Sequence, residues 1–594
     1  MASMIVDASP YSRNEPSMDI SSIVEREVYT PRNITSAPGQ AGRADVITTQ
    51  IMRNALNSAA NQMKRVLIRT SFSPAIYESL DFAVALYDRE IRMLAQGPTL
   101  PAFMGTMSFC VEAAVKEVGG EGALEPGDVI LFNLPYGTGS HAQDMAVILP
   151  VFREEELVGY AASKGHLVDI GAKNPYCTDT IDLFQEGVIF PGVKLYRRGE
   201  LAEDIFKIIL ANSRAPNAVK GDILAEVACC RAGAAELLRV IERFGLQTFH
   251  DCCERMYEHG EAVVRNYISR IPDGRYMGAG DLDNDGLDEK PIHFEVDVVV
   301  EGDEITFDLS GVPDANRGPL NAPFPSTASA CRIVLAMLAG NEAPNEGHFR
   351  PLKIISRSGS MFHPVPPQPT FMYGWPLNSL VEALFQAFTM ALPGCVPSGS
   401  AGDLCGVMFW MYDKECREMR VASTPHPVGM GAFPNADGAT MFITPLAQSK
   451  LASAELMENK WDFLQVEKWE LASDSAGPGK YRGGMGWKID YRLLRDVGMM
   501  TVIDRTKVPS WGQAGGGSGV PNRVTVNYPD GRVIRTTKVT GLDLPKGTLV
   551  ELLCGGGGGY GEPSQRDPRD VRRDVLLGNI SEEKAREYYP HAFA

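Results

Sequence analysis

The stretch NLPYGTGSHAQDMAVILPVFREEELVGYAASKGHLVD, residues 133–169, decides how the chain is organised. A glycine-rich turn leads to His141 and, three residues later, to Asp144. A predicted hairpin then leads to His166 and Asp169, which repeat the same H-x-x-D spacing. Imidazole nitrogens and carboxylate oxygens are the usual ligands of a borderline divalent metal ion. The stretch therefore predicts a mononuclear metal centre with an open position for catalysis.

A competing interpretation is that H-x-x-D occurs by chance and that both histidines only form hydrogen bonds in loops. One such motif alone would favour that interpretation, but two motifs that flank strand-like segments at 146–152 and 158–168 keep both interpretations open. Asp81 is a fourth candidate ligand, because it opens a neighbouring predicted strand and would point into the same cleft. Asp169 is alternatively a residue that orients an imidazole without binding the metal.

The sequence before this stretch predicts an arm and then the first domain. Residues 1–44 are rich in Ser, Pro, Asn and Arg and lack periodicity, which is typical of an extended arm. From Asp45, apolar residues recur every three or four positions, which predicts a helix. Strands are expected at 82–86 and 91–94. Together with the metal-site stretch, these segments predict a β-rich α+β domain at 45–200.

The middle of the chain predicts a helical segment followed by a second α+β domain. Residues 201–275 carry long i, i+3, i+4 apolar spacing, with a helix that ends at Gly245. Two alternating strands at 292–309 open the domain predicted at 276–470. Two buried helices are expected within it, at 326–340 and 377–392.

The last region, residues 471–594, has glycine clusters at 481–486, 514–519 and 554–561 between strand-like segments. A phosphate-binding P-loop would require Lys followed by Ser or Thr between a strand and a helix, and none of these clusters supplies that pair. The clusters therefore favour an all-β region with tight, glycine-enabled corners, closed by a terminal helix. The whole chain is accordingly expected to be a multidomain α+β protein.

Length and composition limit the class of protein. A chain of 594 residues is too long for one hydrophobic core, so roughly two to four domains are expected. The net charge of −17 would repel phosphate backbones and argues against general nucleic-acid binding. Neither an apolar run long enough for a membrane span nor a secretory signal is expected. The 11 cysteines form no C-x-x-C motif, which favours buried thiols and a cytoplasmic location.

Several segments, read in order from about residue 45 to the C-terminus, resemble a known family. They include SLDFAVALYD, LAQGPTLPAFMGTM, NLPYGTGSHAQD, GHLVDIG, NSRAPNAVKGD, SDSAGPGKYRGGMG and GGGGGYGEPSQRDPRDVRRDVLLGNISEEKA. The chain resembles the hydantoinase B/oxoprolinase family, which contains the B subunits of ATP-dependent hydantoinases and lactamases. It is more distantly similar to acetone and acetophenone carboxylase subunits.

The resemblance implies a set of site residues. The family's metal ligands correspond to Asp81, His141, Asp144 and His166, and they imply one divalent ion, with zinc expected first and manganese or iron as alternatives. Asp144 or Asp169 is implied as the carboxylate that moves protons in catalysis. Two departures from the family pattern leave these ligands intact and bear on the substrate class. They are Leu134 in the first motif and the pair Leu167 and Ala172 around the second.

The resemblance also implies a partner and an activity. An ATP-binding hydantoinase A-type subunit would form an (αβ)2 or larger hetero-oligomer with this chain. The implied activity is the ATP-dependent opening of a cyclic amide such as a hydantoin or a lactam, with or without a requirement for bicarbonate. The alternatives are a subunit of an ATP-dependent ketone carboxylase of the acetone or acetophenone carboxylase type, and a non-catalytic scaffold subunit.

Overall fold

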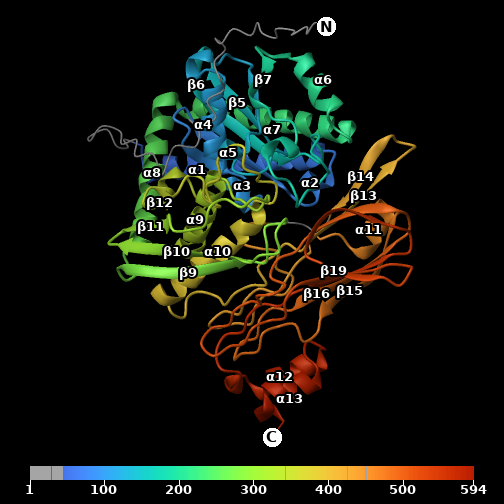
Figure 1. The fold of residues 1–594 in the computed structure, drawn as a ribbon. Helices are drawn as coiled ribbons and strands as arrows, with labels where there is room; N and C mark the ends of the chain where they lie inside the picture. Colours follow the sequence, from blue (N-terminus) through green and yellow to red (C-terminus); the bar gives the residue numbers. More distant parts are fainter. Residues whose placement is uncertain (1–27, 30–43, 341–342, 424–425, 448–450, 594) are drawn as a thin grey trace, which may run out of the picture.

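The structure is a computed structural model that describes residues 28–29, 44–340, 343–423, 426–447 and 451–593. Most of the arm expected at 1–44 lies outside the described residues. The described chain is an α+β structure with four sheets, which confirms the predicted fold class. Figure 1 shows the first sheet with its helices at the top, the second sheet below it, and the orange and red C-terminal strands beside and beneath both.

The first sheet carries the strands of the predicted metal-site domain. Its order is β3-β2-β6-β5-β4-β7-β8, and every neighbouring pair is antiparallel. The pairs predicted around the metal-site stretch are therefore present. The strands are β2 (Phe82–Asp88), β3 (Met93–Gln96), β4 (Val129–Phe132), β5 (Asp144–Arg153), β6 (Glu156–His166), β7 (Pro191–Arg197) and β8 (Glu200–Leu201).

Helices cover both faces of this sheet. Because side chains alternate along a strand, Val84 packs on one face of β2 and Ala85 on the other. Asp45 caps the first helix by accepting hydrogen bonds from the backbone of Ile47 and Thr48, both at 2.9 Å, and Gly245 ends the long helix as predicted. One face is covered by α1 (Val46–Thr70) and α7 (Pro216–Phe244), with α8 (Leu246–Ile268) packed against these two helices, and the other by α4 (Met107–Glu117).

Shorter helices connect these elements. They are α2 (Pro74–Tyr77), α3 (Pro101–Met104), α5 (Pro135–Thr138) and α6 (Glu203–Ala211). None of the helices in the described ranges is both long and apolar enough to cross a lipid bilayer.

The second sheet has the order β1-β12-β11-β10-β9 and packs against two buried helices. Tyr29, from the end of the arm, is buried here, and its hydroxyl accepts a hydrogen bond from Nη2 of Arg332 at 2.5 Å. The strands are β1 (Val28–Tyr29), β9 (Gly274–Leu282), β10 (Ile292–Glu301), β11 (Glu304–Leu309) and β12 (Leu352–Ser356), and the helices are α9 (Phe324–Ala339) and α10 (Gly374–Ala391).

The C-terminal region contains the other two sheets, ordered β14-β13-β17-β20 and β15-β16-β21-β18-β19. The preceding domain was expected to end at residue 470. In the first of these two sheets, however, a strand before residue 470 hydrogen-bonds to a strand after it. The strands are β13 (Gly406–Asp413), β14 (Glu418–Ser423), β15 (Leu464–Ala472), β16 (Gly486–Leu493), β17 (Val497–Val502), β18 (Arg523–Asn527), β19 (Val533–Thr536), β20 (Lys538–Leu544) and β21 (Leu549–Cys554). The helices are α11 (Ala454–Lys460), α12 (Pro568–Leu576) and the expected terminal helix, α13 (Glu582–Tyr588).

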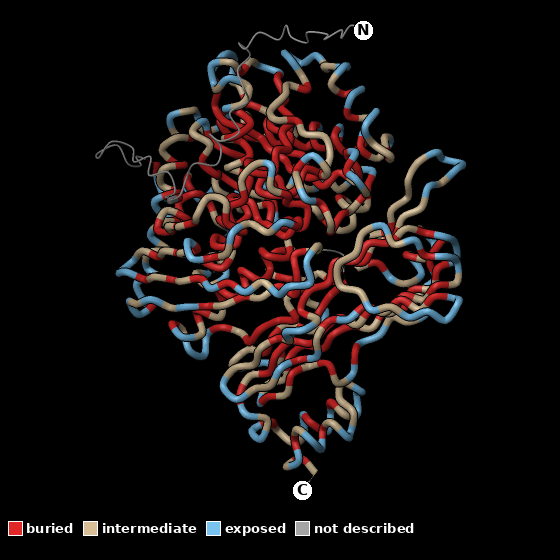
Figure 2. The backbone as a smooth tube through the Cα atoms, viewed as in Figure 1, coloured by how far each residue is buried: buried red, intermediate tan, exposed pale blue. Residues whose placement is uncertain are grey.

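The glycine run 555–559 is buried, and it lies against neighbouring main chains. Figure 2 shows that buried backbone runs through the C-terminal region as well as through the first sheet and its helices. The amide of Gly557 donates to the carbonyl of Gly484 at 3.0 Å, and the Gly557 carbonyl accepts from the amide of Gly477 at 2.8 Å. A Cβ on Gly557 would lie 1.9 Å from the Met430 carbonyl oxygen. The prediction of glycine-enabled corners is wrong for this run. None of these five glycines has a positive φ; glycine is required because neighbouring main chains lie too close to leave room for a Cβ.

Candidate metal centre

The register of the first sheet brings three of the predicted ligands together. Asp144 and His166 are direct cross-strand partners on β5 and β6. The backbone amide of His166 donates to the carbonyl of Asp81 at 3.0 Å, so Asp81 lies beside His166 at the entrance to β2. Adjacent antiparallel strands place directly opposed side chains close together. The three residues therefore gather at one end of three neighbouring strands.

A glycine-dependent turn places the fourth residue, His141. The turn follows α5 and passes through Gly139, whose φ of 79° is the left-handed region that favours glycine. A Cβ at Gly139 would also lie 2.9 Å from the backbone nitrogen of Ser326. The glycine-rich segment at 137–139 thus supports the histidine.

Three ligand atoms face one another in the structure. His141 Nε2 lies 3.0 Å from Asp144 Oδ1 and 3.0 Å from His166 Nδ1, and His166 Nδ1 lies 2.9 Å from Asp144 Oδ1. Metal–ligand bonds of roughly 2.0–2.2 Å at near-tetrahedral angles place the ligands of one ion about 3.3 Å apart. The separations therefore fit three ligands of a single ion, and all three residues are buried.

The surroundings of His141 prepare its ring for metal binding. Nδ1 of His141 lies 2.9 Å from the carbonyl oxygen of Phe371. A carbonyl oxygen can only accept, so Nδ1 carries a hydrogen, and in the neutral form of the ring Nε2 would offer its lone pair to a metal ion. On the other histidine, Nε2 of His166 lies 2.8 Å from the Tyr176 hydroxyl, which fixes that ring as well. Such partners commonly orient metal-binding imidazoles.

Asp144 is a fully buried carboxylate at the centre of this group. Burial raises the pKa of its carboxyl, but the charges and hydrogen bonds of His141 and His166 outweigh that effect, so the pKa lies below its usual range. Its Oδ2 is 3.4 Å from the Tyr373 hydroxyl. A buried anion requires nearby positive charge. The residues therefore fit a cation as the group that they hold.

Asp81 lies at the border between these ligand atoms and open space. Its Oδ2 is 3.9 Å from His166 Nδ1, and its side chain is 29% exposed. Burial and the charge of Asp144 raise the pKa of Asp81 to about 6, against the opposing effect of His166. Its position suits a fourth ligand that completes the site from the side of the solvent.

Asp169, the second acid of the H-x-x-D pairs, and Cys177, which follows Tyr176, form their contacts with other groups. Asp169 forms an ion pair with Arg214, with Oδ1 2.5 Å from Nη2, and it also accepts from the Gly171 amide. Cys177 is buried and its thiol hydrogen-bonds with the backbone of Asn174. Burial raises the pKa of Cys177 to about 12, so this cysteine is a neutral thiol at physiological pH.

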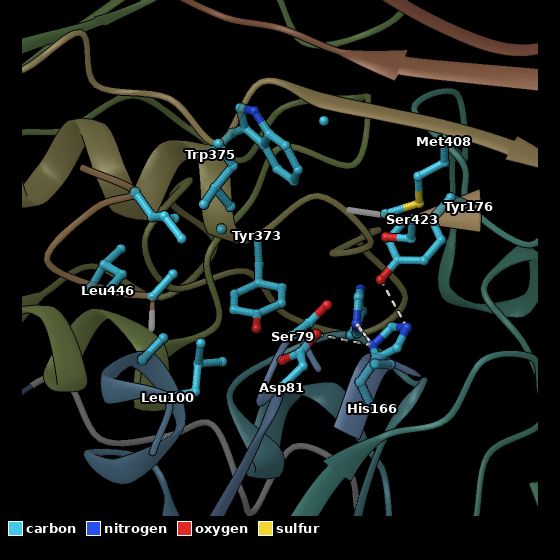
Figure 3. Close-up of a pocket in the computed structure, with 18 of the residues that line it drawn as sticks. Ser79, Asp81, Leu100, His166, Tyr176, Tyr373, Trp375, Met408, Ser423 and Leu446 are labelled. Carbon is cyan, nitrogen blue, oxygen red and sulfur yellow. Dashed lines mark hydrogen bonds and ion pairs between the residues drawn. The ribbon is translucent and has the colours of Figure 1, made fainter. Parts of the chain in front are cut away.

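A cavity of about 210 Å³ opens beside the metal-site residues (Figure 3). Asp81 and His166 lie on one side of it, and the apolar side chains of Trp375, Leu100 and Leu446 lie around the others. Ser79, Ser423 and Asn378 are uncharged polar residues in its lining. The arrangement is that of a largely apolar binding site with reactive groups at one end.

Sequence reasoning missed the residues that complete the site from the opposite side. Phe371 and Tyr373 precede α10, more than 200 residues from His141, and no local pattern links them to it. Glu186 holds this segment in place, because its Oε1 accepts from the backbone amides of Thr370 at 2.8 Å and Phe371 at 2.9 Å. Glu186 therefore fixes the carbonyl that orients His141.

Glu186→Ala is expected to weaken divalent metal binding roughly 10- to 100-fold, because the segment that orients His141 loses its anchor. Titration of the apo-protein with zinc against a competing chelator measures the affinity. Glu186→Gln is the matched control: its amide oxygen can still accept from both backbone amides, so near-normal affinity is expected. Equal affinities for the alanine variant and the wild type would contradict the role of Glu186.

The fold and site define a multidomain α+β protein with a candidate His–Asp–His metal centre beside an apolar cavity. The sequence profile of the Hydantoinase B/oxoprolinase family matches residues 45–563. The chain belongs to the hydantoinase B/oxoprolinase family, as its motifs predicted.

Individual relatives show the same relationship over nearly the whole chain. The B subunit of a putative D-/L-hydantoinase from Pseudomonas sp. (strain NS671) is 30% identical over 571 residues, which cover 91% of this chain and 94% of that protein. The crystal structure of the ATP-dependent caprolactamase from Pseudomonas jessenii matches with a TM-score of 0.85 at 26% identity, over 92% of this chain and 96% of that one. Nucleotide-free acetone carboxylase matches in fold, with a TM-score of 0.83 at 18% identity, over 91% of this chain and 79% of that one.

Proposed function

We propose that this chain is the metal-bearing B-type component of an ATP-dependent amidohydrolase that opens a cyclic amide, such as a hydantoin or a lactam. The observation that carries the proposal is the triangle of His141, Asp144 and His166 ligand atoms at the end of an apolar cavity. The names of the similar hydantoinase and caprolactamase support the substrate class. Zinc is the first choice of ion, because the ligand set mixes imidazole with carboxylate.

His141, Asp144 and His166 would hold the ion, with Asp81 as the fourth ligand. A bound divalent ion would polarise the amide carbonyl or lower the pKa of a water molecule. Tyr176 and Tyr373 hold His166 and Asp144 in position through their hydroxyls. The apolar walls of the cavity exclude bulk water from the reacting amide, which strengthens electrostatic interactions there.

The two carboxylates expected to move protons receive different roles. Oδ2 of Asp144 faces the Tyr373 hydroxyl and Oδ1 faces the two imidazoles, so Oδ2 is the oxygen at which Asp144 would pass on a proton, and its lowered pKa means that it would hold that proton only transiently. Asp169 is engaged by Arg214. We assign Asp169 to fixing the loop after β6, and proton movement to Asp144.

The ATP-dependent step is assigned to a partner of the hydantoinase A type. The glycine run 555–559 is unsuited to phosphate binding, because its amides already donate hydrogen bonds within the protein, that of Gly555 to Oδ1 of Asn522 and the others to main-chain carbonyls. Gly557 donates to Gly484, Gly558 to Gly399 and Gly559 to Gly517. The reaction is thereby divided between two chains. The partner uses ATP to activate the unstrained amide, and this chain then opens the ring at its metal site.

Turnover by the assembled complex tests this function. The complex is supplied with ATP, [14C]bicarbonate and one of three substrates, δ-valerolactam, hydantoin or a ketone such as acetone, before and after metal removal with a chelator. Ring-opened product without retained label, lost on metal removal and restored by zinc, is expected. Label retained in a stable β-keto acid from a ketone substrate would instead identify a carboxylase.

A further inference from the structure

The cavity beside the metal-site residues is lined mainly by carbon. Away from the metal end, its described lining includes the side chains of Leu100, Leu446, Met408 and Trp375 (Figure 3). The indole Nε1 of Trp375 donates to Oδ1 of Asp403 at 2.7 Å, so the one polar atom of this side chain is already engaged. Trp375 therefore presents ring carbon to a molecule in the cavity.

Few polar side chains can reach a molecule in this cavity. Among the described residues that line it, none is Lys or Arg. Asn378 belongs to the lining, but both polar atoms of its carboxamide are buried and closed off from the cavity. Besides the groups at the metal end, the hydroxyls of Ser79 and Ser423 remain. A ring with further charged or amide groups would lose hydration here and gain few partners, which is unfavourable.

The size of the cavity suits one small ring. Its volume is about 210 Å³. For comparison, an engineered cavity of about 150 Å³ with aliphatic and aromatic walls binds benzene. A six-membered lactam is slightly larger than benzene, so it matches this cavity in both size and polarity.

We propose that the substrate is a hydrocarbon lactam, a cyclic amide whose other ring atoms are methylenes. This inference rests on the proposed function and narrows its substrate class. Activation on the partner changes only the amide group, which lies at the metal end, so the methylenes keep their apolar character and lie against the apolar lining. Each buried methylene improves binding roughly fourfold.

The product of such a ring differs sharply from the substrate in polarity. The C–N bond of the activated amide breaks, water supplies a hydroxyl to the carbonyl carbon and a hydrogen to the nitrogen, and ATP is converted into ADP and phosphate. The product is an amino acid with a charged group at each end. An apolar lining that binds the methylenes disfavours these charges, which assists release of the product.

Turnover by the assembled, metal-loaded complex with ATP tests this selection. The probes are δ-valerolactam, diketopiperazine, in which a second amide replaces two methylenes, and a δ-valerolactam that carries a ring carboxylate. The kcat/KM for δ-valerolactam is expected to exceed that for each of the other two at least about tenfold. ATP consumed per ring opened is measured as well, because a ring that the partner activates but the cavity excludes uses ATP without yielding product.

Met408→Gln tests whether the cavity of this chain makes the selection. The new side chain has a similar length and offers an amide to the second amide of diketopiperazine, so the preference for δ-valerolactam should fall roughly three- to tenfold. Met411→Gln is the matched control. Met411 lies on the same strand, β13, but packs against the core of the C-terminal sheets and does not line this cavity. That substitution should leave the preference unchanged.

The outcomes separate this inference from the proposed function. If the wild-type complex opens diketopiperazine, the carboxylated lactam or hydantoin as efficiently as δ-valerolactam, the inference is overturned and the function stands. A preference that Met408→Gln leaves unchanged also overturns it, because the selection then lies outside this lining. If the complex opens none of these rings, both proposals fail.

Discussion

His141→Ala is expected to lose stoichiometric divalent metal and to lower the turnover of the complex by at least about 10³-fold, since the metal contributes several kcal/mol to transition-state stabilisation. The substitution removes Nε2, which touches both Asp144 and His166, and leaves the strand pairing intact. Elemental analysis of the purified protein and steady-state assays with the partner and ATP measure the two effects.

His293→Ala is the matched control for His141→Ala. The His293 side chain is 58% exposed and pairs with Asp281 at 2.8 Å on the surface of the second sheet. It should retain both metal and activity. A His141→Ala complex that remained fully active without bound metal would show that the chain is a non-catalytic scaffold.

Gly557→Ala is expected to destabilise the C-terminal region by more than about 3 kcal/mol, because the new Cβ would overlap a backbone carbonyl that cannot rotate away. The nearest atom, the Met430 carbonyl oxygen, would be 1.9 Å away, and the Gly431 backbone nitrogen 2.7 Å away. Thermal or urea unfolding followed by near-ultraviolet circular dichroism measures the loss.

Gly122→Ala provides the comparison. Gly122 is exposed, has no positive φ, and a Cβ there would meet no atom within 4 Å. Its replacement should change stability by no more than about 0.5 kcal/mol. Wild-type stability for Gly557→Ala would mean that the packed main chains can separate at little cost.

Much of the fold follows from local signals in the sequence. Asp45 marks the start of α1 because its carboxylate accepts from the first free amides of the helix, and Gly245 marks the end of α7. Alternating apolar residues identify β10 and β11. These signals depend on residues only a few positions apart, so a single sequence is enough to predict these helix ends and strands.

Only part of the candidate site can be predicted from such local sequence patterns. The H-x-x-D spacing and the strands that follow it indicate His141, Asp144 and His166 as candidate ligands. The predicted hairpin makes Asp144 and His166 cross-strand partners although they are far apart in the sequence. Phe371, just before α10, and Asn378, within it, reach the site through tertiary packing, which no local pattern encodes. The glycine run was misinterpreted for a related reason: its requirement comes from distant main chains, whose approach cannot be seen in the run itself.

The glycine run also sets the order in which the C-terminal region can be completed during synthesis. Residues 555–559 are the hydrogen-bond partners of the segments around Gly399, Gly477 and Gly517, all of which leave the ribosome earlier. The main-chain groups of those segments stay unpaired until residues 555–559 have been synthesised. A nascent or truncated chain that stops short of residue 555 therefore exposes the edges that chaperones and proteases recognise, whereas the first sheet and the helices that cover it are complete by residue 268 and can fold earlier.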